Sequence, residues 1–179
     1  TPVSGLASDP VDAKCNAAST FSYFYQPKAS EGGSCTFTIA GDDPCFVPYD
    51  PANPPAPVEI ADFTNDRGDT VKSIVRVERG AINRGIYEIV SFFDPSAPAQ
   101  DGAALRGWNG KLLWMFGASA AASRFQTPTN TNVVFDDTAL RQGYMVAASS
   151  LNNNGTNANH TLAAETLMMV KEHIVEQYG

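Results

Sequence analysis

Serines, histidines and paired carboxylates are the groups of this chain whose types suit nucleophilic or acid–base chemistry. Ser119 and Ser123 are candidate nucleophiles, but no Gly-x-Ser-x-Gly motif surrounds them or occurs anywhere in the chain. His160 follows an apolar run and an asparagine-rich stretch, a position from which a side chain can contact substrate. The alternative is an exposed histidine at a helix start. His173 lies within a helical pattern and is typical of a solvated or packed residue. The catalytic nucleophile is therefore not expected among these residues.

Carboxylates and cysteines also bind metals, but their spacing here favours structural roles. Asp136 and Asp137 begin a predicted short helix, and acidic side chains at a helix start more often interact with the helix N-terminus than with a metal. The cysteines lack the close pairs of a zinc site; they are Cys15, Cys35 and Cys45. We therefore expect no metal site and no cofactor.

Cys35 and Cys45 are the expected disulfide pair, because they flank a loop rich in Gly, Asp and Pro. Cys15 is then left over, and in an exported protein an odd cysteine suggests a partner in another segment. The alternative is that all three are free thiols. The chain starts at Thr1 rather than Met, which indicates that a preceding segment has been removed.

The composition of the chain argues against several classes of partner. Of its 179 residues, 43% are hydrophobic and 17% charged, which is enough apolar material for one packed domain. The net charge of −7 comes without a basic patch, so nucleic-acid binding is not expected. No apolar run reaches the roughly 18 residues that a membrane span needs, so no membrane partner is expected.

The strongest strand signal is an alternation of apolar and polar residues in the middle of the chain. It predicts an antiparallel hairpin with strands at residues 70–79 and 86–93, joined by a loop at residues 80–85. One face of the hairpin is expected to pack on a core. Glu78, with Arg76 and Arg79, is expected on the opposite, solvated face.

The second half of the chain alternates strands and helices. Two continuously apolar runs, residues 111–116 and 144–149, predict neighbouring central parallel strands that are covered on both faces. A short helix at residues 136–142, closed by Gly143, lies between them. This order predicts an α/β fold with a mostly parallel sheet and an antiparallel start.

The chain ends in a predicted helix at residues 162–178, with Thr161 as a candidate N-cap. Apolar side chains recur on one face of this helix at helical spacing and are expected to be buried, part of them against another chain: Ala163, Leu167, Val170, Ile174 and Tyr178.

Residues 1–57 differ in character from residues 58–179. They are rich in Pro and Gly, and we interpret them as an irregular N-terminal segment, with residues 20–25 as a candidate strand. Residues 43–57 contain too many prolines for a helix or a central strand, because proline removes hydrogen-bond donors. They are expected to run as an extended surface segment against the domain formed by residues 58–179.

Four segments between about residue 70 and the end of the chain are typical of one protein family. They are IVRVERGAINRGIY (residues 74–87), GWNGKL (residues 107–112), RQGY (residues 141–144) and AETLMMVKE (residues 164–172). Through these segments the chain resembles a secreted family of α/β-hydrolase type. The family comprises a domain of unknown function and is distantly similar to tannases and feruloyl esterases. The resemblance implies an α/β-hydrolase-type sheet that is incomplete without a following segment.

In that family the last helix seen here leads to a further strand and a glycine-flanked serine, with Asp and His later in the chain. None of these follows in this sequence. We therefore expect the N-terminal fragment or subunit of a secreted or periplasmic serine esterase, inactive alone. Its partner would be a companion C-terminal chain carrying the nucleophile, in a heterodimer, and its substrate an ester. The alternative is a non-enzymatic binding or structural module on a hydrolase-like fold.

The resemblance further assigns Gly117, Ala118 and Ser119 to an oxyanion loop, in which the backbone N–H of Ala118 or Ser119 points at the nucleophile. Gly117 allows a sharp turn after a buried strand, and the small residues leave room for a substrate carbonyl. Where the family has a run of glycines and a cysteine, this chain has Ala118, Ser119 and Ala120. The alternative is that the small residues serve tight packing of a helix on a strand.

Overall fold

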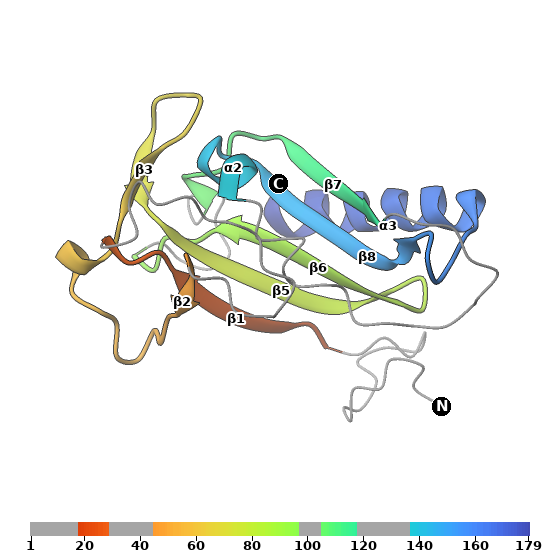
Figure 1. Cartoon of the computed structure of the whole chain (residues 1–179), viewed down its shortest axis with the longest axis horizontal. Helices are drawn as coiled ribbons and strands as arrows, with labels where there is room; N and C mark the ends of the chain where they lie inside the picture. Colours follow the sequence, from red (N-terminus) through yellow and green to blue (C-terminus); the bar gives the residue numbers. More distant parts are fainter. Residues whose placement is uncertain (1–17, 29–44, 97–104, 118–136) are drawn as a thin grey trace.

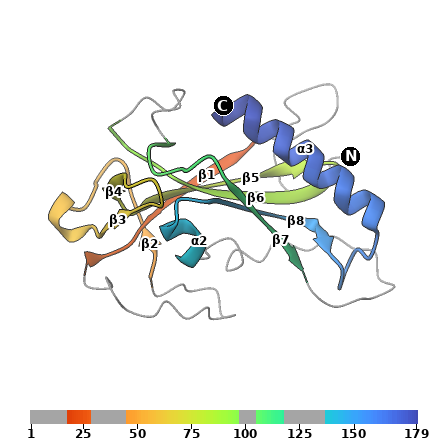
Figure 2. The same ribbon diagram turned by 90° about the horizontal axis from the view of Figure 1, so that it is seen from above.

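A six-stranded sheet with a long helix on one face forms the body of the protein (Figures 1 and 2). The computed structural model describes residues 18–28, 45–96, 105–117 and 137–179. The order of the strands in the sheet is β2-β1-β5-β6-β8-β7. Their bounds are β1 (Thr20–Tyr25), β2 (Val47–Pro48), β5 (Ile74–Ile82), β6 (Gly85–Phe92), β7 (Leu112–Gly117) and β8 (Met145–Asn153). A separate small sheet pairs β3 (Asp62–Thr64) with β4 (Thr70–Lys72).

The main sheet is mostly antiparallel, so the prediction of a mostly parallel sheet is wrong. Only β7 and β8, among the strands described, run parallel to each other. The α/β class is confirmed, because α2 (Asp137–Arg141) lies between these two strands in the chain and α3 (His160–Tyr178) follows them. The difference arises because β8 pairs antiparallel with β6, the second strand of the hairpin. On the other side of the hairpin, β1 pairs antiparallel with β5, and β2 pairs antiparallel with β1.

The predicted hairpin is present as β5 and β6, but its loop is much shorter than residues 80–85. Ile82 pairs with Gly85, which leaves a two-residue turn at Asn83 and Arg84. Both turn residues have positive φ, 53° and 64°, which matches the right-handed twist of a tight hairpin. The strands therefore continue to the tip, and most of both strands is buried.

β7 and β8 are neighbouring parallel strands, as predicted, with Leu112 opposite Met145. β8 is central and buried over nearly its whole length. β7, in contrast, is the last strand of the sheet in the described part of the chain, and its residues are half-buried. The prediction that both strands are central and covered is therefore wrong for β7, whose Phe116 is 60% exposed.

The helices match their predicted ranges closely. α2 ends at Arg141, and Gly143 (φ 86°) closes it, with its N–H donating to Leu140 O at 2.8 Å. α3 begins two residues earlier than predicted, because its N-cap is Asn159 and not Thr161. Its buried face consists of Ala163, Thr166, Val170, Ile174 and Tyr178, whereas Leu167 is only half-buried. None of the helices described here is long and apolar enough to cross a membrane.

The described part of the N-terminal segment joins the same sheet. Residues 20–25 form β1, as their alternation favours, and β1 pairs with β5. The proline-rich residues 49–60 run along the surface between β2 and β3, with a 3₁₀ turn, η2 (Pro57–Glu59). Cys45 is buried, while Cys15 and Cys35 lie outside the described residues, so the Cys35–Cys45 pairing stays a prediction.

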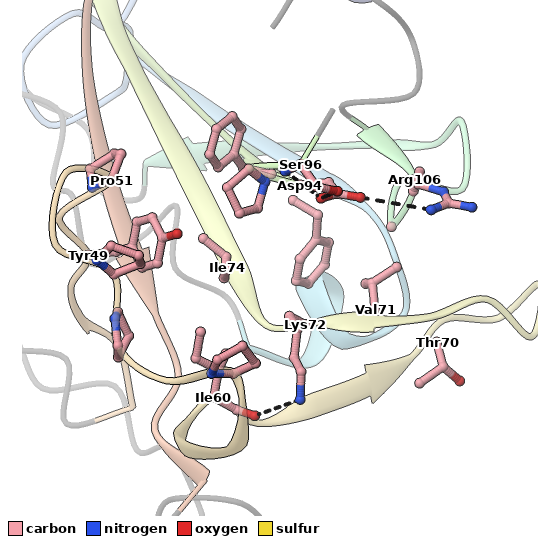
Figure 3. A pocket seen from close by; sticks show the side chains of 17 residues that line it. Tyr49, Pro51, Ile60, Thr70, Val71, Lys72, Ile74, Asp94, Ser96 and Arg106 are labelled. Carbon is pink, nitrogen blue, oxygen red and sulfur yellow. Dashed lines mark hydrogen bonds and ion pairs between the residues drawn. The ribbon is translucent and has the colours of Figure 1, made fainter. Parts of the chain in front are cut away.

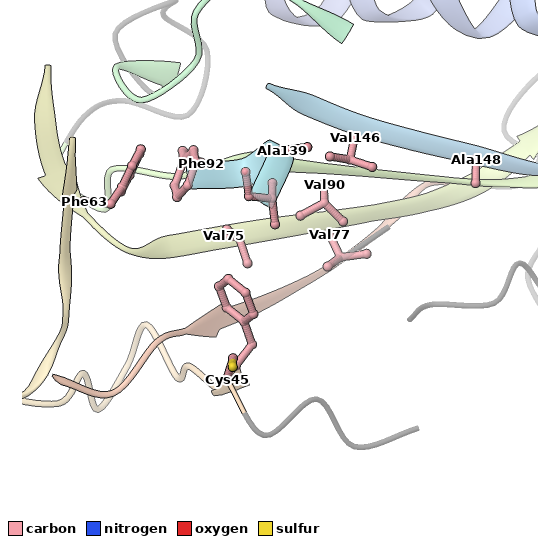
Figure 4. Close-up of a cluster of buried hydrophobic side chains, with 11 residues drawn as sticks. Cys45, Phe63, Val75, Val77, Val90, Phe92, Ala139, Val146 and Ala148 are labelled. Atoms are coloured by element: carbon pink, nitrogen blue, oxygen red, sulfur yellow. The ribbon is translucent and has the colours of Figure 1, made fainter. Parts of the chain in front are cut away.

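Two hydrophobic clusters cover the two faces of the sheet. On one face, side chains from β5, β6 and β8 meet α2 and the small β3–β4 sheet, and the rings of Phe63 and Phe92 stack at 3.8 Å (Figure 4). On the other face, Ile89, Met145 and Ala147 pack under Val170 and Ile174 of α3. Both faces of β5, β6 and β8 are therefore covered, and most side chains of these strands are buried.

Candidate functional site

The predicted site lies at the carboxyl edge of the parallel strand pair. β7 ends at Gly117, which is opposite Asn153 at the end of β8 after a register shift. A Cβ added at Gly117 would lie 2.8 Å from the Cγ and Oδ1 atoms of Asn153, so only glycine fits. Close packing on Asn153 thus accounts for Gly117. Ala118 and Ser119 lie outside the described residues, so the oxyanion loop stays a prediction.

The asparagine-rich stretch at this edge forms an ordered turn. Asn153 O accepts the N–H groups of Thr156 and Asn157, at 3.0 and 2.8 Å. The buried Asn152 side chain donates to Ala163 O at 3.0 Å and so ties the end of β8 to α3. Asn152 Oδ1 is buried and has no hydrogen-bond partner. These asparagines therefore fix the position of the helix start.

His160, the predicted substrate contact, is the first residue of α3 and is exposed. It lies at the same end of the sheet as Gly117, separated from β8 by the turn at residues 154–159. In the part of the chain that the structure describes, no hydrogen bond or ion pair holds its ring. His160 is thus free to meet a ligand at this edge, and its role stays a prediction.

A buried carboxylate on β5 is the centre of a polar cluster that the sequence did not predict. Glu78 is 2% exposed and accepts hydrogen bonds on both oxygens. Tyr87 Oη donates to Oε1 at 2.6 Å, and His173 Nε2 lies 2.7 Å from the same oxygen. Tyr178 Oη donates to Oε2. The cluster thus joins the hairpin to the last two turns of α3.

Electrostatics keep this carboxylate ionised. Burial by itself would raise the pKa of Glu78, but the hydrogen bonds from His173, Tyr178 and Tyr87 outweigh burial and lower the pKa to about 2. Burial and the adjacent carboxylate raise the pKa of Tyr87 and of Tyr178 well above the usual tyrosine value. Both phenols therefore remain protonated and donate hydrogen bonds to Glu78. The carboxylate of Glu78 thus has a structural role, because it binds side chains of α3.

The expectation that Glu78 and Arg76 are solvated is therefore wrong, whereas the side chain of Arg79 is still 39% exposed. Arg76 is only 8% exposed, and its guanidinium lies 5.1 Å from the ring centres of Phe21 and of Tyr178. Arg79 forms an ion pair with the fully buried side chain of Glu88. The face of β5 that carries Arg76 and Glu78 is covered by α3. Arg79 lies on the other face, because side chains alternate along a strand. The sequence did contain an indication of a buried polar partner for α3, because His173 and Tyr178 place polar atoms near the apolar face of that helix.

Carboxylates do not gather into a cation site in the ranges that the structure describes, where no group of three or more His, Cys, Asp or Glu side chains converges. Asp137 is the first residue of α2, and Asp136 lies outside the described residues, so the helix-start role of this acidic pair stays a prediction.

A cavity of about 550 Å³ lies at the opposite end of the sheet from Gly117 (Figure 3). It is lined by the proline-rich segment, the β4–β5 junction and the end of β6, including Tyr49, Ile74 and Phe93. The sequence contains no pattern that indicates this cavity, because its walls come from segments that are distant in the chain.

The chain belongs to the tannase-like family of unknown function DUF6351, which matches residues 1–179. This confirms the resemblance and extends it over the N-terminal third. The match indicates kinship with ester hydrolases of the tannase type. No curated protein and no solved structure matches the chain.

Proposed function

We propose that this chain is the N-terminal part of an exported serine esterase, with its nucleophile on a companion C-terminal segment. The observation that carries the proposal is the β7–β8 pair. The two strands end together at Gly117 and Asn153, at the kind of edge where ligands bind in such sheets. Membership of a tannase-like family supports the reaction class.

The outer edge of β7 offers a place for the companion segment. In the described chain no strand pairs with it, and Phe116 stands exposed there. An unpaired edge strand exposes N–H and C=O groups that another strand satisfies. A strand added at β7 would bring a nucleophile elbow to the edge that holds Gly117.

In the proposed reaction, the companion's histidine accepts the proton of the serine, whose oxygen attacks the ester carbonyl. The alcohol leaves with that proton, and the acyl group stays on the serine. Water, activated by the same histidine, then hydrolyses the acyl-serine and releases the acid. The carbonyl oxygen becomes an oxyanion, which the backbone N–H of Ala118 or Ser119 stabilises. One such donor contributes about 3 kcal/mol to the transition state. This chain therefore supplies electrostatic stabilisation and no nucleophile.

A serine-directed fluorophosphonate probe tests the proposal, alongside hydrolysis of p-nitrophenyl esters. We expect the assembled protein to hydrolyse the esters and to carry the label on the companion segment, while this chain alone does neither. A label on Ser119 or Ser123 would contradict the placement of the nucleophile. An assembled protein without hydrolysis or label would favour a non-enzymatic binding module, for which the cavity in Figure 3 is the supporting observation.

A matched pair of variants tests the oxyanion loop. Ser119→Pro removes a backbone N–H, whereas Ser119→Ala removes only the hydroxyl. If that amide stabilises the oxyanion, Ser119→Pro lowers kcat about 100-fold with little change in KM, and Ser119→Ala keeps full activity. Ala118→Pro and Ala118→Gly form the equivalent pair for the other amide. Unchanged kcat in both proline variants would exclude the loop.

A further inference from the structure

The cavity of about 550 Å³ has the size of a small-molecule site and lies apart from the proposed ester site (Figure 3). It opens where β6 ends at Phe92, and β8 begins near that end, since Val146 pairs with Val90. Gly117 and Asn153 lie at the other end of β8. Nine residues of strand span roughly 30 Å, so one ligand of small size cannot occupy both places.

The apolar walls of the cavity are held in place by the protein itself. Proline rings of the segment 49–60 form one wall, and proline fixes its own φ angle. The segment is fastened at both ends, where Tyr49 N–H donates to Tyr23 O and Ala61 N–H donates to Gln26 O, both at 2.9 Å. Asp50 accepts the N–H of Ala52 at 2.9 Å within it. A ligand therefore meets a wall that needs little ordering.

Figure 3 shows Asp94, Ser96 and Arg106 close together at one side of the cavity, whereas the ammonium of Lys72 points to Ile60. Lys72 Nζ is engaged with Asp62 Oδ1 at 2.8 Å and with Ile60 O at 3.3 Å. Asp94 Oδ1 accepts the N–H and the hydroxyl of Ser96, at 2.9 and 2.6 Å.

Arg106 is the charged group of the cavity that is least committed to the protein. Its side chain is 70% exposed, and its nearest partner is Asp94 Oδ2 at 3.9 Å. That distance is too long for a hydrogen bond, so the planar fork of the guanidinium keeps its donors for a ligand. A carboxylate fits this fork with two parallel hydrogen bonds.

We propose that this cavity binds a small aromatic monocarboxylate. The ring lies between the proline wall, which includes Tyr49, and the side chain of Phe93, and the carboxylate meets Arg106 at the rim. The chemistry calls for a flat apolar body, because the walls are apolar, and for a single negative charge, because one cation is available. The site is independent of the proposed esterase chemistry.

Ligand-observed NMR on the full chain at low micromolar concentration tests the proposal, with benzoate, benzamide and benzylamine as probes. We expect benzoate to bind with a Kd on the order of 1 mM, which is typical of so small a ligand. Its affinity should exceed those of neutral benzamide and cationic benzylamine at least about fivefold. Benzylamine or benzamide binding as well as benzoate would overturn the assignment of an anion site.

Variants locate the binding. Arg106→Gln should weaken benzoate at least about fivefold and leave benzamide unchanged, while Ser96→Trp, at the exposed mouth, should weaken both. Lys171→Gln removes an exposed cation of α3 and should change nothing. Absence of benzoate binding to the native chain, or equal binding by the native chain and both cavity variants, would overturn the proposal.

Discussion

Glu78 shows how one side chain fixes the position of a whole helix. Its carboxylate receives donors from β6 and from α3, and one of them comes from Tyr178, 100 residues away in the chain. A buried carboxylate is costly without such partners, and each partner is costly without the carboxylate. The members of the cluster therefore stabilise one another. A substitution of Glu78 should lower the free energy of unfolding even where it leaves the size of the side chain unchanged.

Glu78→Gln is expected to lower the free energy of unfolding by roughly 2–4 kcal/mol at neutral pH, because two buried phenols lose a charged acceptor. Urea denaturation measures this value. Glu172→Gln on the exposed side of α3 is the matched control and should stay within about 0.5 kcal/mol of the native protein. Equal stability of both variants would show that the cluster does not hold the helix.

Acid should weaken the same contact. The folded pKa of Glu78, about 2, is lower than its ordinary value of 4.5, so its contribution to stability is complete above about pH 5. That contribution is lost as the pH falls from 4.5 towards 2, because the unfolded state then binds the proton first. Urea midpoints between pH 6 and pH 2 should therefore fall more steeply for the native protein than for Glu78→Gln. Parallel curves would contradict the depressed pKa.

At the level of elements, the start of α3 is fixed by a side-chain cap. Asn159 Oδ1 accepts the N–H of Leu162 at 3.1 Å. Asn159→Ala should therefore lower the free energy of unfolding by about 1 kcal/mol, and Asn159→Asp should retain most of the stability. Thr161→Ala, at the cap position that the sequence favoured, should have little effect. A larger loss from Thr161→Ala than from Asn159→Ala would reverse the assignment.

The end of α2 depends on a glycine that is confined both by its φ angle and by its neighbours. A Cβ at Gly143 would lie 2.8 Å from Gly107 O and 2.9 Å from Asn65 Cβ, whereas a Cβ at Gly68 would meet nothing within 4 Å. The two glycines have almost the same φ, 86° and 87°. Gly68→Ala should therefore cost about 1 kcal/mol, from φ alone.

Gly143→Ala should cost at least about 1 kcal/mol more than Gly68→Ala, because backbone and side chains must shift around the new methyl group. Thermal or urea unfolding of the two variants measures the difference. Equal losses of unfolding free energy in the two variants would show that the neighbours of Gly143 move aside without lowering stability.

Local patterns predicted most of these elements, and long-range pairing explains the errors. The apolar runs and the glycine stop located β8, α2 and α3 within a few residues, because they depend on near neighbours. The partner of β6 is set by tertiary packing, so a mostly parallel sheet was predicted instead. Glu78 was assigned to solvent because α3, which covers it, lies far along the chain. Of the predicted site, the structure describes only Gly117 and His160.

At the scale of the whole molecule, several large apolar side chains are exposed to solvent. Phe116 on β7 is 60% exposed, and Met168 and Val175 on α3 are 65% and 59% exposed. Met168 and Val175 are seven residues apart and share one face of the helix. Such exposure indicates a contact surface when it gathers on one side of a molecule.

The isolated chain should therefore self-associate as its concentration rises, and addition of the companion segment should suppress this. Analytical ultracentrifugation measures the effect. Replacement of Met168 and Val175 by Gln should reduce self-association without loss of helix content, and the exposed pair Glu172→Gln with Lys171→Gln serves as the control. A native chain that stays monomeric at all concentrations would contradict the companion proposal.

The contact between Glu78 and Tyr178 also determines when, during synthesis of the chain, the sheet and α3 can pack together. A ribosome releases the chain from its N-terminus, so the β5–β6 hairpin emerges long before the residue that completes its polar cluster. Until the last turn of α3 arrives, the hairpin carries a carboxylate that cannot be buried. The sheet can therefore close under α3 only after Tyr178 has been synthesised. Contacts of such long sequence separation also slow folding.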